Sequence, residues 1–582
     1  MKKIFVKSRW LFTMLLFVTT MIMPTMMLAK SIDLKIPEGD GKTEPYQISS
    51  REELYWFARL VNGTLPGGEK NVSANAKLMN DITVNEGVLD AVNKGQVSDF
   101  IEWEPIGTSD VPYTGTFNGK GYTVSGLYFN NPTSYYVGLF GCIGANGKIS
   151  NVGVLDSYFQ FCALGGGVCG MNKNGELQNC SNSSTVICNM QDGTGGVCGY
   201  NSKGTVRDCK NTGSVRGKAT LGGVCGVNSY GTITNCFNEG AVSVTVTSAN
   251  VGGVCGNNYS GTIKCSYNTA SVSGQYNVGG VCGSNSYGTI TNCYYLSDTA
   301  IGGINGKDVS GKAEGKSIEK FESGEVAYLL AEAEGKVLGE QVWGQQLGKD
   351  LYPVLGSDYK VIKAAQGNKD ANGHYTYWAT FSNLTNDVTL SVPSGRKLNV
   401  YNATVSGGKM TLTERNSRVA KEEGVLLKTD GEYVNAKVNK TNELTPASSY
   451  ENHLVATPAE AKTVTAETGC KLYRLTYNKA EKKEGLGFYL GVDDGKSLMA
   501  TPGKAYLKVS EDEVKAPSSE ALTRSFVFGG GSETTGIDGI TIMGTDVQRH
   551  GTVEGIFDLQ GRKIVNPTKG IYIKNNKKVI IR

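Results

Sequence analysis

Cysteine is the residue type whose spacing most suggests chemistry in this chain. Fourteen cysteines occur among 582 residues, and in an exported protein such a number normally indicates disulfides. Five of them follow the sequence Gly-Gly-Val and recur at intervals of 29, 27, 30 and 27 residues. If the repeats stack on one another, equivalent cysteines form a column whose geometry suits a disulfide badly. We therefore predict that these cysteines are small apolar core residues. Pairing between the two thiols of one repeat is the alternative. The five are Cys169, Cys198, Cys225, Cys255 and Cys282.

Metal-dependent and nucleophilic catalysis find little support among the other reactive residues. The three histidines are His374, His453 and His550, and none of them is followed by Glu. The His-Glu-x-x-His zinc signature is therefore missing, and the cysteine repeats contain no histidine. Cys470 stands in no motif that would activate a nucleophile. We therefore predict no catalytic residue, no metal site and no cofactor.

Carboxylates are the remaining candidates for catalysis. Enzymes that cleave polysaccharides need Asp, Glu, Lys or Arg side chains that converge on one groove. The acids between residues 165 and 300 are few, and Glu176 and Asp208 stand where most repeats have Thr or Asn. Stacked repeats would bring Glu176 near Arg207, which we interpret as a solvated ion pair. A carbohydrate-active enzyme, either a polysaccharide lyase or a glycosidase, is the alternative function.

Tyrosines mark the candidate binding surface. Tyr230 and Tyr287 share one column of the repeat, before Gly-Thr-Ile, and Tyr259 is displaced from it by one residue. Tyrosines at exposed turns stack on sugar rings or pack against a protein partner. The alternative is that they only shield the column below. We predict a glycan or a host or cell-surface protein as the partner.

The repeat itself must position these residues. Each copy has Asn three residues after the first Cys, Gly six residues after it and an aliphatic residue eight residues after it. Short runs of Val, Ile and Thr between Asn and Gly indicate β-strands with tight turns. A period near 28 residues predicts an all-β fold with a parallel β-helix of about six coils, in which equal positions stack about 4.8 Å apart. The stacked amides would form a hydrogen-bonded ladder of Asn172, Asn201, Asn228, Asn258 and Asn285.

The repeat resembles a known family motif. A degenerate copy begins at Gly138-Leu139-Phe140-Gly141, and the later Gly-Gly-Val-Cys-Gly copies are each followed by Asn, Gly-Thr-Ile and Asn-Cys elements. These residues are similar to the GLUG repeat, which occurs in adhesin-like bacterial surface proteins and in some metallopeptidases that cleave immunoglobulin A. The resemblance implies a spacer or display surface. The missing zinc signature removes the metallopeptidase function.

Both flanks of the repeat predict further domains. Ser50 to Glu53 forms a capping box that opens a short helix ending at Gly63. The segment that contains this helix would cap the first coil. The alternative is that the Trp and Phe residues nearby line a ligand groove. A second helical stripe near Leu330 would cap the last coil, and alternating strands after it predict a β-sandwich. The predicted segments are 1–29 signal peptide, 30–137 N-terminal cap, 138–305 solenoid, 306–357 helical cap or linker, 358–535 β-sandwich and 536–582 sorting-like tail.

The N-terminus predicts export. Four basic residues precede an apolar run that is broken by Pro24 and ends near Ala29, as in a cleaved secretory signal, with an uncleaved anchor as the alternative. Removal of this segment lowers the net charge from +4 to about zero, so nucleic-acid binding is not expected. No later segment is apolar enough for a transmembrane anchor. We predict a secreted or outer-surface protein.

The C-terminal tail resembles the sorting tail of type IX secretion substrates. The resemblance rests on Gly555-Ile556-Phe557-Asp558 and on the basic, aliphatic end, where Asn575-Asn576 would turn a final hairpin. A hairpin that docks on the sandwich is the alternative. Together these features favour a non-enzymatic, adhesin-like binding protein with the solenoid as stalk or display face. A purely structural matrix component is a third hypothesis.

Overall fold

The computed structural model describes residues 32–528, apart from 98, 191–192, 219, 246–248, 370–371, 450, 478–484 and 516–524, and the backbone of five short strands after residue 539. The predicted signal peptide lies outside these residues. The chain divides into two compact units. The first unit contains Met1–Lys363, Leu390–Gly395 and Tyr433–Asn439, and the second contains the remaining segments.

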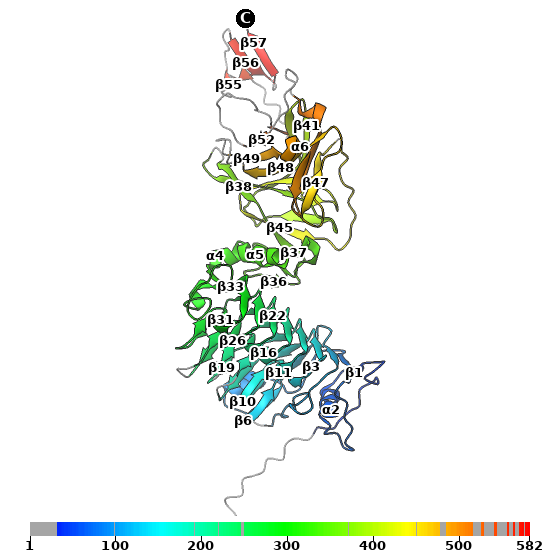
Figure 1. The fold of residues 1–582 in the computed structure, drawn as a ribbon, viewed down its shortest axis with the longest axis vertical. Coiled ribbons are helices and arrows are strands. Elements are labelled where there is room, and N and C mark those ends of the chain that lie inside the picture. Colours follow the sequence, from blue (N-terminus) through cyan, green and yellow to red (C-terminus); the bar gives the residue numbers. More distant parts are fainter. Residues whose placement is uncertain are drawn as a thin grey trace, which may run out of the picture. The chain divides into compact units, whose positions relative to one another are not determined.

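The first unit is a parallel β-solenoid of about eight turns, which confirms the predicted fold class (Figure 1). Each full turn passes through four sheets, called A to D here. Sheet A has nine parallel strands, and so does sheet B. Sheet A contains β1 (Tyr46–Ile48), β2 (Ala76–Leu78), β4 (Thr116–Asn118), β8 (Lys148–Ser150), β12 (Glu176–Gln178), β17 (Thr205–Arg207), β22 (Thr232–Thr234), β27 (Thr262–Lys264) and β32 (Thr289–Thr291). Sheet B contains β3 (Ile82–Thr83), β5 (Thr123–Ser125), β9 (Gly153–Leu155), β13 (Ser181–Asn182), β18 (Lys210–Asn211), β23 (Phe237–Asn238), β28 (Tyr267–Asn268), β33 (Cys293–Leu296) and β34 (Ala313–Lys316).

Sheets C and D complete each turn. In sheet C the long strand β10 pairs with two shorter strands of the next turn, so the sheet continues as two rows. Sheet C contains β6 (Tyr128–Val137), β10 (Tyr158–Gly166), one row of β14 (Thr185–Cys188), β19 (Val215–Gly217), β24 (Val242–Val244) and β29 (Val272–Ser273), and another of β15 (Thr194–Gly195), β20 (Leu221–Gly222), β25 (Val251–Gly252) and β30 (Val278–Gly279). Sheet D contains β7 (Phe140–Ile143), β11 (Cys169–Lys173), β16 (Cys198–Ser202), β21 (Cys225–Ser229), β26 (Cys255–Tyr259) and β31 (Cys282–Ser286).

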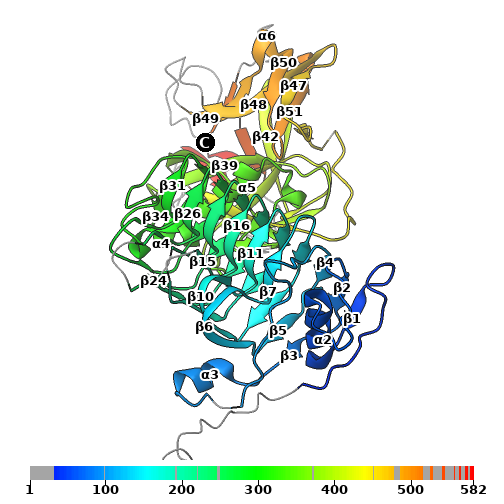
Figure 2. The same ribbon diagram turned by 60° about the horizontal axis from the view of Figure 1, so that its bottom comes forward.

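The solenoid has more turns than the six repeat copies because the leader segment also forms strands of sheets A and B. Helix α2 (Arg51–Asn62) lies beside these first strands (Figure 2). As predicted, it begins after Ser50, whose side chain accepts a hydrogen bond from the Glu53 N–H, and it ends at Gly63 with φ of 74°. Trp103 and Phe117 are buried in the same core, so they pack inside the leader instead of lining a groove. A second short helix, α3, covers Val88–Asn93.

The segment after the repeats packs against the side of the solenoid. Helices α4 (Ile318–Glu322) and α5 (Glu325–Glu334) and strand β35 (Trp343–Gly344) lie on the outer face of sheet B. Their buried partners come from three successive turns, namely Phe237, Tyr267 and Tyr294. The helical stripe was predicted to cap the last coil, and its contact with these aromatic side chains extends over three turns. Strands β36 (Val354–Leu355), β37 (Tyr359–Lys363) and β45 (Tyr433–Val438) complete this unit.

The second unit consists mainly of antiparallel sheets, as the alternating strands predicted. Two sheets share one core, to which Trp378 and Leu426 contribute from one sheet and Phe488 and Leu507 from the other. The first sheet contains β38 (Ala365–Lys369), β39 (Tyr375–Phe381), β44 (Val425–Thr429), β41 (Leu398–Ser406), β42 (Lys409–Arg415) and β53 (Ile540–Met543). The second contains β46 (Leu454–Ala456), β51 (Ala505–Ser510), β48 (Cys470–Tyr477), β49 (Leu486–Leu490) and β52 (Ser525–Val527).

Smaller elements complete the described chain. Strand β40 (Val388–Ser391) pairs with β43 (Arg418–Val419), and β47 (Lys462–Thr465) pairs with β50 (Ser497–Ala500). The short helices are α6 (Val492–Gly495) and α7 (Glu511–Val514). In the tail, β54 (Ile556–Phe557), β55 (Lys563–Ile564), β56 (Gly570–Lys574) and β57 (Lys577–Ile581) form an antiparallel sheet. The predicted turn at Asn575-Asn576 lies outside the described residues.

Candidate functional site

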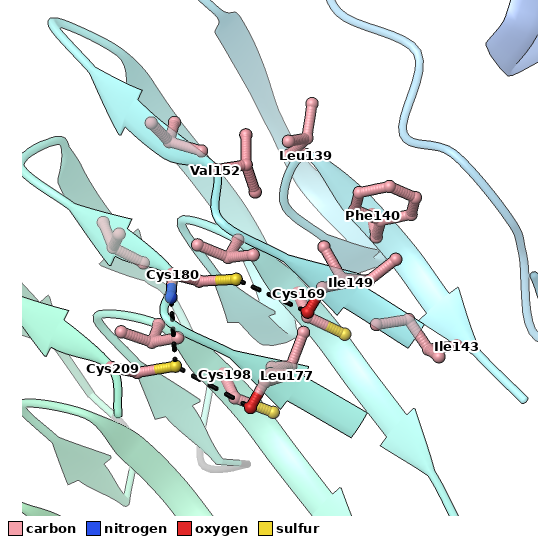
Figure 3. Packing of buried hydrophobic residues seen from close by; sticks show 14 of the residues in the cluster. Leu139, Phe140, Ile143, Ile149, Val152, Cys169, Leu177, Cys180, Cys198 and Cys209 are labelled. Carbon is pink, nitrogen blue, oxygen red and sulfur yellow. Dashed lines mark hydrogen bonds between the residues drawn. The ribbon is translucent and has the colours of Figure 1, made fainter. Parts of the chain in front are cut away.

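The first cysteine column lies inside the solenoid. Cys169, Cys198, Cys225, Cys255 and Cys282 are in-register neighbours in sheet D, and each is fully buried. Figure 3 shows Cys169 and Cys198 pointing into the interior beside Leu177 and Ile149. All fourteen cysteines are free thiols in the structure. Burial raises the pKa of Cys169, Cys225 and Cys282. Hydrogen bonds with these neighbours outweigh burial and lower the pKa of Cys198 and Cys255. All five thiols are out of contact with solvent, so they serve as packing residues.

The second cysteine column differs from its simplest alignment at one place. Cys180, Cys209, Cys236 and Cys293 point inward, but Cys265 adopts the positive φ of 50° that belongs to the preceding corner position. Ser266 fills the inward position instead, where its hydroxyl accepts a hydrogen bond from the Cys236 N–H at 3.1 Å. The sequence carries the signal for this shift, because Cys265 follows its partner Cys255 by ten residues where the other copies have eleven.

The predicted asparagine column forms a continuous buried ladder. Each Nδ2 donates to the Oδ1 of the next asparagine, over 2.9 Å from Asn172 to Asn201 and 2.7 Å from Asn258 to Asn285. Each side chain also bonds the backbone of the glycine three residues on, as Asn172 does with Gly175. A second buried ladder, which the sequence analysis did not identify, joins Asn182, Asn211, Asn238 and Asn268. The ladders fix the corners of the solenoid and leave no free polar group for a ligand.

The three predicted tyrosines lie together on the outside of the solenoid. Their exposed fractions are 56% for Tyr230, 41% for Tyr259 and 89% for Tyr287. Ring centroids are 5.6 Å apart for Tyr230 and Tyr259 and 6.1 Å apart for Tyr259 and Tyr287, both in edge-to-face geometry. Tyr230 and Tyr287 occupy left-handed corner positions, whereas the equivalent corner of the middle turn is Ser260. The one-residue displacement of Tyr259 therefore keeps it within the row, which we call the tyrosine ladder.

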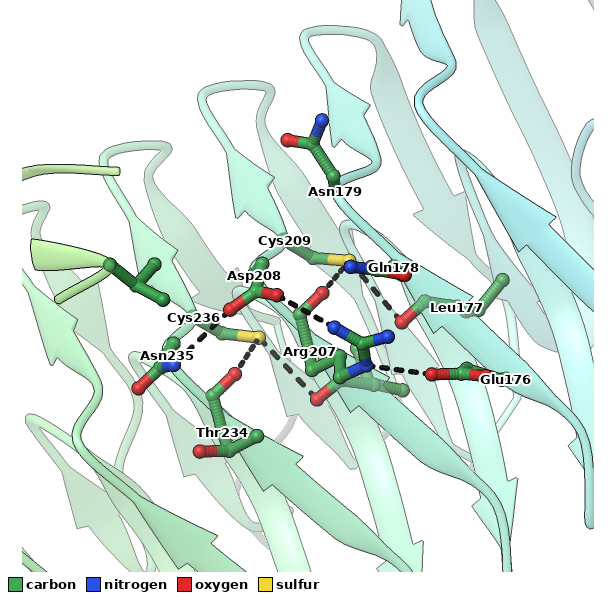
Figure 4. A network of polar contacts seen from close by, with 12 residues as sticks. Glu176, Leu177, Gln178, Asn179, Arg207, Asp208, Cys209, Thr234, Asn235 and Cys236 are labelled. Atoms are coloured by element: carbon green, nitrogen blue, oxygen red, sulfur yellow. Dashed lines mark hydrogen bonds and ion pairs between the residues drawn. The ribbon is translucent and has the colours of Figure 1, made fainter. Parts of the chain in front are cut away.

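The predicted ion pair between adjacent turns is present on the outer face of sheet A. Arg207 Nε lies 2.6 Å from Glu176 Oε1, and Arg207 Nη1 lies 3.1 Å from Asp208 Oδ2 (Figure 4). Asn235 Nδ2 donates to Asp208 Oδ1 over 3.2 Å. Each carboxylate is therefore held by the same guanidinium. All three charged side chains remain partly exposed, which is the geometry of a surface ion pair.

The remaining reactive residues are not gathered into one site. His453 lies in the second unit, where its Nδ1 accepts a hydrogen bond from the Val405 N–H at 3.1 Å. His550 is outside the described residues, and Cys470 is half-buried. Among the residues that the structure describes, no three His, Cys, Asp or Glu side chains are grouped to hold a metal ion. In the same part of the chain, no helix is long and apolar enough to cross a membrane.

One outward column of sheet B was missed by the sequence analysis. Its members directly follow the inward-pointing residues of the second cysteine column. They change along the solenoid from the polar Ser181 and Lys210 to the aromatic Phe237, Tyr267 and Tyr294. The rings of Phe237 and Tyr267 are stacked at 5.0 Å with an interplanar angle of 9°. Alignment of the repeats at this position would have shown the change from polar to aromatic side chains that marks the face covered by α5.

Comparison with known proteins supports the repeat assignment. Residues 192–216 match the GLUG motif. A protein of Evansella cellulosilytica that has provisionally been named a Gly-rich membrane protein is 41% identical over 56 residues. The matched part covers 10% of this chain and 6% of that relative. No solved structure matches the chain.

Proposed function

We propose that this protein is an exported, non-enzymatic binding protein that acts at the cell surface or after release. The solenoid is its display face, and the tyrosine ladder contacts a glycan or a host or cell-surface protein. The observation that carries the proposal is a row of three exposed aromatic side chains on successive turns of the solenoid. The GLUG motif and the relative named as a membrane protein are consistent with such a location.

The scaffold favours binding because the ladder is ordered before a partner arrives. Tyr230 N–H donates to the Tyr259 carbonyl over 2.9 Å, so the backbone of adjacent turns is fixed. A hydrogen bond to Tyr230 also raises the pKa of the Tyr259 hydroxyl. Tyrosine offers a large contact area at low cost in side-chain entropy, and a preorganised surface loses little further entropy on binding. All three side chains remain exposed, Tyr287 most of all.

The carbohydrate-active enzyme is a weaker candidate for this chain. Its best residues are Glu176 and Asp208, and Arg207 holds both carboxylates. A general acid or nucleophile must reach the scissile bond of a substrate, and these groups are engaged with a cation instead. The matrix-component hypothesis predicts self-assembly without a ligand.

Glycan and cell-surface-protein arrays probed with the mature chain test this proposal. The triple variant Tyr230→Ala, Tyr259→Ala, Tyr287→Ala should lose at least about tenfold in affinity, because each stacked ring contributes on the order of 1 kcal/mol. Tyr276→Ala is the matched control, since Tyr276 is 57% exposed and stands outside the ladder. Equal binding by the wild type and the triple variant would remove the ladder from the proposal.

Release of reducing sugar from bound glycans separates the enzyme from the binding protein. We expect binding without release. Release that is abolished by Glu176→Gln or Asp208→Asn would establish the enzyme and reject the proposal. Concentration-dependent assembly of the mature chain with no bound array ligand would favour the matrix component instead.

A further inference from the structure

A groove lies along the corner between sheets A and B. Its volume is about 250 Å³. Equivalent outward positions of three successive sheet B strands, Gly153, Ser181 and Lys210, lie in register in it. Asn179 and Asp208 line it from the corner. The three-residue strands of sheet A separate this corner from the tyrosine ladder, so the groove is a distinct surface.

The groove is hollow because of Gly153 and closed by apolar residues. A Cβ atom on Gly153 would lie 2.9 Å from Ser181 Oγ and 3.1 Å from Thr123 Cγ2, so any side chain there would fill the space. Phe237 follows Lys210 in the sheet B column, and Leu355 of β36 lies with it in the lining. The groove therefore has a polar part and an apolar part.

The polar part contains a break in an amide ladder. At this corner Asn151 Nδ2 donates to Asn118 Oδ1 over 3.1 Å, and Asn179 Nδ2 donates to Asn151 Oδ1 over 2.8 Å. The next residue in the column is Asp208, which has no amide to donate. Asn179 Oδ1 consequently accepts no hydrogen bond from the described residues. The Oδ1 atom of Asn179 and the Asp208 carboxylate, which also binds Arg207 and Asn235, thus line the groove as neighbouring hydrogen-bond acceptors.

The charges of the groove restrict the chemistry of a ligand. The side chain of Lys210 is exposed, and its charge interacts with that of Glu239. A cation would meet Lys210, and an anion would meet the Asp208 carboxylate, whose charge the partly exposed ion pair with Arg207 offsets only in part. A neutral sugar avoids both conflicts, because its hydroxyls donate to Asn179 and Asp208 and accept from Lys210 and Ser181. Its C–H face packs on Phe237 and Leu355.

We propose that this corner groove binds one neutral hexose residue of a glycan. The groove is smaller than the roughly 300–1,000 Å³ of pockets that hold drug-sized ligands, so a single ring is the matching size. The site is independent of the tyrosine ladder. It supplies an amide oxygen and a carboxylate, which are hydrogen-bond acceptors that discriminate a hydroxyl from a group that cannot donate.

Saturation-transfer NMR of the full mature chain tests the groove. The probes are D-glucose, D-galactose and D-mannose, each also as its linear trisaccharide, with D-galacturonate as an acidic comparison. Asp208→Asn is the key variant, because Asn stands at this corner in the neighbouring turns and completes the ladder by donating to Asn179. We expect it to fold with an unchanged or higher melting temperature and to weaken hexose binding at least tenfold. Lys210→Ala should weaken binding as well.

Three results would overturn the proposal. They are no transfer from any neutral probe, unchanged binding by Asp208→Asn, or binding of galacturonate alone. The tyrosine triple variant distinguishes the two surfaces. Its retention of hexose transfer supports the groove even if the ladder has no partner, and its loss of transfer with Asp208→Asn unaffected assigns the sugar to the ladder and rejects the groove.

Discussion

The repeat turns and the antiparallel unit bury different kinds of polar group. Among the described residues between 138 and 300, the buried polar side chains are all Asn, Ser or Thr. Among the described residues of the antiparallel unit the buried set also includes Asp387, Glu423 and Lys471. The repeat turns therefore bury only neutral amides and hydroxyls, whereas the antiparallel unit also buries charged side chains.

Translation along the solenoid explains the difference. A residue that recurs in every turn has its own copy as a neighbour about 4.8 Å away, so a charged column would repel itself. An amide is both donor and acceptor and can satisfy an identical neighbour on each side. In the second unit each buried charge has a different partner. Asp387 accepts from the backbone N–H groups of Lys421, Glu443 and Leu444, and Arg415 pairs with Glu423.

Alkaline pH should separate the two units most strongly. Burial raises the pKa of Cys142 and Cys265 to about 11 and that of Cys293 to about 12, from 9.0. A thiol whose pKa is higher in the folded state contributes stability that is fully present below pH 9. This stability is lost as the pH rises through the pKa of the folded state. At pH 10 each such thiol lowers the unfolding free energy of the solenoid by about 1.4 kcal/mol, and the three together lower it by several kcal/mol.

Urea unfolding at pH 8 and pH 10 measures this loss. The solenoid transition should move to lower urea, whereas the second unit, whose one cysteine is the half-buried Cys470, should move little. A Cys142→Ala, Cys293→Ala variant should reduce the dependence on pH. An unchanged solenoid transition would mean that these sulfurs are not free thiols.

Interruption of the buried ladder should have the next largest effect. Asn228 donates to Asn258 and accepts from Asn201, each over 2.8 Å. Asn228→Leu leaves a donor above and an acceptor below without partners, at about 1–3 kcal/mol for each. We expect a loss of about 3 kcal/mol or more in the unfolding free energy of the solenoid.

A single amide of the second unit provides the comparison for Asn228. Asn399 makes one side-chain bond, to Glu414 over 2.7 Å, and is only half-buried. Asn399→Ala should cost about 1 kcal/mol or less by urea unfolding. Equal losses for the two variants would show that the ladder has no special importance.

Mild acid should give the smallest difference, and it should act on the second unit. Burial lowers the pKa of His453 below its ordinary 6.5, and the nearby Glu513 partly opposes the shift. A lowered His pKa contributes stability that is present above pH 6.5 and is lost as the pH falls through the folded value. Between pH 7.5 and 5.5 we expect a decrease on the order of 1 kcal/mol in the second unit.

His453→Gln tests the source of this acid dependence. Gln retains an acceptor for the Val405 N–H and cannot be charged. The variant should abolish the decrease, and the repeat turns, which contain no histidine, should show none. A decrease that persists in the variant would assign the titration to another group.

Contacts within the solenoid could be predicted accurately wherever the two residues in contact occupy equivalent positions of successive repeats. The register of Cys169 with Cys198, and of Asn172 with Asn201, follows directly from the alignment. The ion pair of Glu176 with Arg207 was predicted for the same reason. The tyrosine ladder was also recognised from the columns, although the contact of Tyr259 with both neighbours depends on corner conformation.

Prediction failed where contacts join unlike segments. The leader strands carry no repeat signature, so their two additional turns were not expected. Packing of α5 on Phe237 and Tyr267 depends on side chains that are distant in sequence. The groove depends on Gly153, on the missing amide at Asp208 and on Leu355 from beyond the repeats. None of these relations has a fixed spacing, so only the folded structure brings them together.

The direction of the asparagine ladders has an evolutionary consequence. Every bond in the two buried ladders runs from one turn to the equivalent residue of the following turn. Duplication or deletion of one complete turn joins equivalent residues again and preserves each bond, despite periods of 27 to 30 residues. The length of the rod can therefore change in whole steps during descent, without the compensating mutations that the second unit would need.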